Sequence, residues 1–137
     1  TDCHLMARVL VVEDDYDTRR LMRRWLEGGR HSVEETGSVA AARAALRSGE
    51  GCDIVVCDVL LPGAPGWDLI REMAADPVFG GTPVLVVSIT DADDTPDDVR
   101  VAGWLVKPFT RQHLLEAVAA VVSPAPDGGA IERGPAV

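Results

Sequence analysis

Residues 8–15 read RVLVVEDD: one arginine, then four apolar residues, then three acids. A short apolar run rich in β-branched residues predicts a strand that is buried on both faces. The acids then fall at the carboxyl end of that strand, where open parallel sheets bind their ligands. Three neighbouring carboxylates repel each other, so they favour a bound cation. The alternative is that Asp15 caps a helix and its neighbours complement the helix dipole, and these eight residues alone do not separate the two.

Composition limits the classes of protein to which the chain can belong. Its 137 residues suit one domain, and a net charge of −9 argues against direct nucleic-acid binding by this domain. No apolar stretch approaches a membrane span and no signal-peptide pattern is present, so we expect a cytoplasmic protein without a membrane partner. The three cysteines are odd in number and lack metal-type spacing, which predicts free thiols, with Cys57 in the core.

Strand-like and helix-like segments alternate along the chain. The pattern predicts strands over 9–12, 31–36, 54–57, 84–87 and 104–106, and helices over 15–27, 39–47, 67–75 and 110–122. A further helix between the last two strands would be short or irregular because of Pro96. Five strands alternating with five helices predict an α/β fold: a flavodoxin-like, doubly wound parallel sheet of order 2-1-3-4-5 with helices on both faces. We expect one domain over residues 6–122 and a Pro/Gly-rich tail or linker over 123–137.

The first predicted helix has a clear apolar stripe. Leu21, Met22, Trp25 and Leu26 are expected on its core-facing side, with arginines opposite.

Polar residues stand at the carboxyl ends of the buried strands. Glu13 and Asp14 follow the first, Asp58 the third, Ser88 the fourth and Lys107 the fifth. Parallel strands end at one sheet edge, so these side chains are expected to converge into a phosphoryl-transfer site. Carboxylates would hold Mg²⁺ there, and the lysine and serine would hold phosphoryl oxygens. Taken singly, each residue has an ordinary explanation as a cap, a turn residue or a surface charge.

The motifs VVEDD at 11–15, Asp58 followed by Pro62 and Gly66, Ser88, and KPF at 107–109 occur in the order found in a known family. On these residues the chain resembles the receiver domains of two-component response regulators, from about residue 7 to residue 122. The resemblance implies that Asp58 is the phosphoacceptor. It also implies that Asp14 and Asp58 bind Mg²⁺ directly, together with the backbone carbonyl of Leu60, and that Glu13 acts through water.

The resemblance also implies a set of switch residues. Lys107 would pair with Asp58 at rest and with the phosphoryl group afterwards, and Ser88 would move to hydrogen-bond that group. The peptide before Pro108 would be cis, and Trp104 occupies the position of an aromatic switch residue.

The function implied is a phosphorylation switch supplied by a sensor histidine kinase or a phosphotransfer protein. Such a domain is not an enzyme in the ordinary sense, although it assists its own phosphorylation and dephosphorylation. An output domain or partner would bind the region 89–122, and a homodimer is left open. The alternative is a pseudo-receiver that binds a partner without phosphorylation. The complete acid, serine and lysine set argues against this alternative, and the short, acidic segment between Ser88 and Lys107 argues for it. A phosphohydrolase would need a second acid where Leu60 stands.

Overall fold

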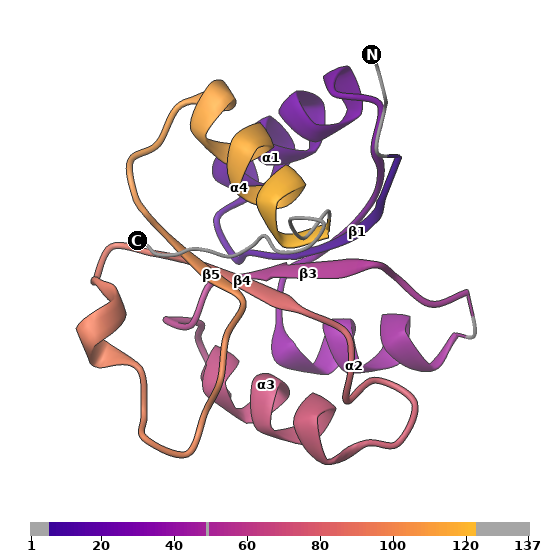
Figure 1. Cartoon of the computed structure of the whole chain (residues 1–137), viewed down its shortest axis with the longest axis vertical. Coiled ribbons are helices and arrows are strands. Elements are labelled where there is room, and N and C mark those ends of the chain that lie inside the picture. Colours follow the sequence, from indigo (N-terminus) through magenta and orange to yellow (C-terminus); the bar gives the residue numbers. More distant parts are fainter. Residues whose placement is uncertain (1–5, 49, 123–137) are drawn as a thin grey trace, which may run out of the picture.

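Five parallel strands form one sheet in the order β2-β1-β3-β4-β5 (Figure 1). The computed structural model describes residues 6–48 and 50–122, so the linker expected over 123–137 lies outside the described residues. The elements in chain order are β1 (Arg8–Val12), α1 (Tyr16–Gly28), β2 (Ser32–Thr36), α2 (Val39–Arg47), β3 (Ile54–Cys57), α3 (Gly66–Ala75), β4 (Val84–Ser88), a 3-10 helix η1 (Ala92–Asp94), β5 (Gly103–Val106) and α4 (Arg111–Val122). The predicted strand order is confirmed.

Helices cover the sheet on both sides, with α1 and α4 on one face and α2 and α3 on the other (Figure 1). Successive strand residues point to opposite faces. Thus Val9 and Val11 pack in the core beneath α1 and α4, whereas Leu10 and Val12 pack in the core that faces α2 and α3. Two-sided burial explains why β1, β3 and β4 read as continuous apolar runs. Cys57 is fully buried, as predicted.

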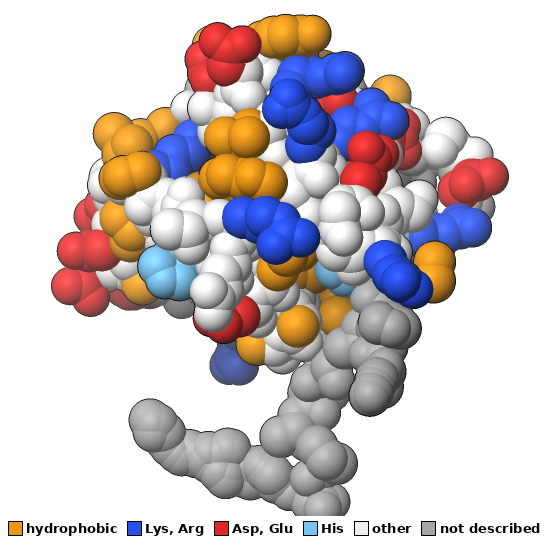
Figure 2. Space-filling view, turned by 90° about the horizontal axis from the view of Figure 1, so that it is seen from above, with side chains coloured by type: hydrophobic (Ala, Val, Ile, Leu, Met, Phe, Trp, Pro, Cys, Tyr) orange, Lys and Arg blue, Asp and Glu red, His pale blue; other side chains and the backbone are white. Residues whose placement is uncertain are grey.

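On the face that carries α1 and α4, basic and acidic side chains lie next to each other (Figure 2). Arg23 of α1 pairs with both Glu27 and Glu35 at 2.9 Å. The arginines that follow one another along α1 therefore do not form an isolated basic surface.

The prediction that a helix between the last two strands would be short or irregular is confirmed, so the described residues hold four regular α-helices and not five. Between β4 and β5 the described chain forms only the three-residue 3-10 helix η1. One local feature explains this: Pro96 has no N–H with which to continue a helix beyond η1. Asp91 caps the start of η1, and its carboxylate accepts from the Asp93 N–H at 2.9 Å. From this segment Val99 is buried in the core, and Val101 packs against it.

Leu21 also departs from the expected pattern. Met22 and Leu26 of α1 are buried as predicted, but Leu21 is 39% exposed. Each residue of a helix turns by about 100°, so Leu21 lies at the margin of the apolar stripe. It lines a shallow cavity with Trp25 and Phe109.

Helix lengths bear on membrane insertion. The longest helix in the described ranges has 13 residues, and none of the described helices is long and apolar enough to cross a bilayer.

His31 is a buried, neutral hydrogen-bond acceptor, and this predicts a pH dependence of stability. Its Nδ1 accepts from the Ala7 N–H at 3.1 Å, and burial lowers the pKa of the imidazole. Below about pH 6.5, the usual histidine pKa, the unfolded chain binds a proton that folded His31 resists, so stability falls as pH falls. His31→Gln keeps an acceptor without a titrating group, and we expect it to lose less stability than wild type on acidification.

The measurement is urea denaturation at about pH 7.5 and about pH 5.5, on either side of the histidine pKa. His113→Gln, at an exposed position, is the matched control and keeps the wild-type dependence. Equal losses for wild type and His31→Gln would contradict this role.

Candidate functional site

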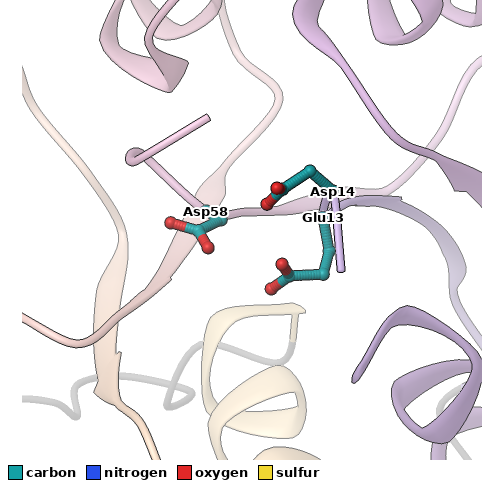
Figure 3. A group of neighbouring side chains, drawn as sticks. All are labelled: Glu13, Asp14 and Asp58. Carbon is teal, nitrogen blue, oxygen red and sulfur yellow. The ribbon is translucent and has the colours of Figure 1, made fainter. Parts of the chain in front are cut away.

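The carboxyl ends of four strands bring the predicted site residues to one edge of the sheet. Asp58 follows β3, Glu13 and Asp14 follow β1, Ser88 ends β4 and Lys107 follows β5. β1 and β3 pair in register up to Val12 and Cys57, so the acids that come next are neighbours. The carboxylates of Glu13 and Asp14 lie on the side that faces Asp58 (Figure 3).

The three acids form a compact set of oxygen donors. One carboxylate oxygen from each of Glu13, Asp14 and Asp58 lies within 4.8 Å of the others. Glu13 and Asp58 are buried, whereas Asp14 is exposed, so the set opens to solvent on one side. Hard divalent cations take oxygen ligands in such groups and keep water on their open side. The donor set therefore fits a divalent cation.

Lys107 joins two of these acids. Its Nζ donates to Asp58 Oδ2 at 2.7 Å and to Glu13 Oε1 at 2.6 Å. Burial acts to lower the pKa of this ammonium, but the hydrogen bonds to Asp58 and Glu13 outweigh it and raise the pKa. Lys107 is the only lysine in the sequence, so it supplies the one ammonium side chain available here. The Lys107–Pro108 peptide that precedes α4 is cis.

Glu13 is held at both carboxylate oxygens. Oε1 accepts from Lys107, and Oε2 accepts from the Asp15 N–H at 3.1 Å. Burial raises the pKa of this carboxyl, and the bond from Lys107 opposes part of that rise. Asp15 itself caps α1, accepting from the Thr18 N–H at 2.9 Å, so the capping interpretation holds for Asp15. Glu13 and Asp14 belong to the acid cluster. The cation-binding interpretation therefore concerns Glu13 and Asp14, and the capping interpretation concerns Asp15.

Arg19 positions the loop that carries these acids. Its Nη1 donates to the Glu13 carbonyl at 3.0 Å, and its Nε donates to Glu35 of β2 at 3.1 Å. Sequence reasoning missed this residue, because nothing distinguishes it from the other arginines of α1.

Backbone N–H groups of Leu60 and Gly66 hold the loop that follows Asp58. Asp58 Oδ1 accepts from the Leu60 N–H at 2.8 Å, and the Gly66 N–H donates to the Val59 carbonyl at 3.0 Å. A Cβ atom on Gly66 would lie against the Asp58 carbonyl oxygen and 2.8 Å from Val59 Cα. Only glycine lets the start of α3 approach the Asp58 loop so closely. The Leu60 side chain is 53% exposed at the rim of the site.

Ser88 and Trp104 are both bound to Thr90. Ser88 is fully buried, and its Oγ lies 3.1 Å from Thr90 Oγ1 and accepts from the Thr90 N–H at 3.3 Å. The Trp104 Nε1–H donates to the Thr90 carbonyl at 2.8 Å, and its ring lies 5.9 Å from that of Trp67. Thr90 was also missed from the sequence, although a serine hydroxyl can accept from the backbone N–H two residues on, which is the bond that Ser88 makes with Thr90.

Comparisons with known proteins agree with this geometry. The family described as "Response regulator receiver domain" matches residues 9–119. The chain is 33% identical over 115 residues to the chemotaxis protein CheY of Pseudomonas aeruginosa, covering 81% of this chain and 92% of that protein. It is 32% identical over 138 residues to the transcriptional regulatory protein TcrA of Mycobacterium tuberculosis, covering 93% of this chain and 51% of TcrA.

A solved structure gives the same result for the fold. The chemotaxis response regulator CheY4 of Vibrio cholerae superposes with a TM-score of 0.79 at 26% identity, covering 85% of this chain and 99% of CheY4. The family match spans most of the chain and includes every site residue described above. The chain therefore belongs to the family of response regulator receiver domains, the signalling modules of two-component systems.

Proposed function

We propose that this chain is a phosphorylation switch in which Asp58 accepts a phosphoryl group from a phosphohistidine. The donor would be a sensor histidine kinase or a phosphotransfer protein. The observation that carries the proposal is the buried Asp58 carboxylate, 2.7 Å from Lys107 Nζ and clustered with Glu13 and Asp14. A carboxylate oxygen can act as a nucleophile and form an acyl phosphate, and Lys107 Nζ lies beside the Asp58 oxygen at which that bond would form.

The residues present support transfer of a phosphoryl group from a histidine nitrogen to an Asp58 oxygen. An Asp58 oxygen forms a bond to phosphorus while the bond from phosphorus to the histidine nitrogen breaks, and the electron pair leaves with the imidazole. The product is an acyl phosphate. Negative charge is spread over the phosphoryl oxygens as this happens, so donors aimed at them lower the barrier. Lys107 already reaches an Asp58 oxygen, and Ser88 at the adjacent strand end would supply a second donor.

The cation proposed for the acid cluster is Mg²⁺. Asp14 and Asp58 would bind it directly with the Leu60 carbonyl, and Glu13 would contact it through water. When bound, Mg²⁺ would neutralise charge on the acids and on the phosphoryl oxygens.

We propose that the signal leaves through the region 89–122, towards an output domain, a separate partner or a second copy in a homodimer. TcrA, a transcriptional regulatory protein, is about twice as long as the part that matches this chain, which supports an output domain in related proteins. The switch would assist its own phosphorylation and dephosphorylation rather than turn over a substrate.

A second candidate is a pseudo-receiver that binds a partner without phosphorylation. The observation in its favour is the segment between β4 and β5, which holds only η1. The region 89–122 is the surface proposed to carry the signal. The loss of a regular helix from it would suit a domain that does not signal by phosphorylation.

The test is intact mass after incubation with Mg²⁺ and phosphoramidate. This donor cannot acetylate Lys107, and its P–N bond resembles that of phosphohistidine. We expect one added phosphoryl group on wild type, and none with EDTA or on Asp58→Asn. A folded wild type that gains no phosphoryl group in Mg²⁺ would refute the proposal and favour the pseudo-receiver.

A further inference from the structure

Thr90 makes three polar contacts that join two residues of the proposed switch. Its N–H and its hydroxyl both contact Ser88 Oγ, and its carbonyl accepts from the Trp104 indole. Ser88 is fully buried and Thr90 half-buried, so these bonds lie where water competes poorly for them. One residue thus holds the hydroxyl on β4 and the indole on β5.

The contacts with Thr90 occupy the hydroxyl that the proposed chemistry needs. A serine hydroxyl has one proton to donate and two lone pairs. The Thr90 N–H takes one lone pair, and the Thr90 hydroxyl takes either the proton or the second lone pair. If Ser88 Oγ moves towards a phosphoryl group on Asp58, as the resemblance to the family implies, it moves away from Thr90, and its contact with the Thr90 hydroxyl at 3.1 Å must lengthen or break.

We propose that Thr90 is a positioning residue that holds Ser88 in its resting position and passes the movement of Ser88 on to Trp104. The inference rests on the proposed function, because it concerns how the phosphoryl group recruits Ser88. It also alters the role predicted for Trp104. The indole is tied to the Thr90 carbonyl at 2.8 Å and packs on Trp67, so it responds to Thr90 and does not swing freely.

The test uses beryllofluoride, an analogue of the phosphoryl group on a carboxylate, titrated in the presence of Mg²⁺. Thr90→Val keeps the shape and the backbone contacts but removes the hydroxyl. The resting state then loses a bond that the bound state does not use. We expect affinity for beryllofluoride to rise about fivefold, the effect of one hydrogen bond between neutral groups. Thr90→Ser retains a hydroxyl and is expected to restore the wild-type affinity.

A double-mutant cycle separates this role from a general effect on folding. In a Ser88→Ala background there is no hydroxyl to hold, so Thr90→Val is expected to leave the affinity unchanged. An equal rise in both backgrounds, or no rise in the wild-type background, would overturn the inference.

The indole N–H resonance of Trp104, assigned with Trp104→Phe, is the second readout. We expect it to shift with the same midpoint as the binding of beryllofluoride. A resonance that stays in place while wild type binds would overturn the link to Trp104. Failure of wild type to bind beryllofluoride at all would overturn the proposed function, and this inference with it.

Discussion

Replacement of Lys107 by methionine is expected to lower the free energy of unfolding by roughly 3 kcal/mol in metal-free buffer. The variant keeps most of the side-chain volume but removes the ammonium that both Glu13 and Asp58 contact. Glu13 is 1% exposed, so its charge would remain buried without a partner. Added Mg²⁺ should stabilise this variant more than wild type, because a cation in the acid cluster restores the missing positive charge.

The measurement is guanidinium denaturation in EDTA and in Mg²⁺. Arg43→Met is the matched control, since Arg43 pairs with Glu72 at 2.7 Å on the surface, where water screens the pair, and we expect it to destabilise the protein much less than Lys107→Met does. If Lys107→Met is as stable as wild type in EDTA, the two buried acids do not depend on this lysine.

Replacement of Gly66 by alanine is expected to destabilise the fold by about 3 kcal/mol. The added methyl group would press on the Asp58 carbonyl oxygen and lie 2.8 Å from Val59 Cα, both backbone atoms that cannot rotate away. Relief requires α3 or the Asp58 loop to move. We therefore expect the phosphorylated yield with phosphoramidate to fall as well, even under conditions where the variant is folded.

Gly81→Ala provides the control for this substitution. A Cβ atom there meets nothing within 4 Å, so thermal unfolding and phosphorylation should stay close to wild type. If Gly66→Ala unfolds at the same temperature as wild type, the Asp58 loop accommodates the methyl group with little loss of stability, which would contradict this prediction.

Most of the fold could be predicted from the sequence because the patterns that mark the strands are local. Apolar runs such as Val84–Val87 mark strands that are buried on both faces, and a polar residue directly after each run marks the ligand edge. The convergence of Asp58 and Lys107 follows from strand ends that share one edge, so it could be predicted without coordinates. Pro96 correctly indicated that a regular helix would not form between β4 and β5.

Other features depend on tertiary contacts that no local pattern encodes. Arg19 matters because its guanidinium meets the Glu13 carbonyl and Glu35 on another strand. Leu21 fits the apolar pattern yet lies partly exposed at the margin of α1. The contacts of Thr90 with Ser88 and Trp104 depend on how the chain turns after β4, and resemblance to the family directed attention to Trp104 instead.

The most direct test of the central claim is to locate the phosphoryl group. Borohydride reduces an aspartyl phosphate to homoserine, and peptide mapping by mass spectrometry then identifies the position. After treatment with Mg²⁺ and phosphoramidate we predict homoserine at position 58 and no change at Glu13 or Asp14. Homoserine at position 14, or a phosphorylated protein with an unchanged residue 58, would contradict the assignment of Asp58 as the phosphoacceptor.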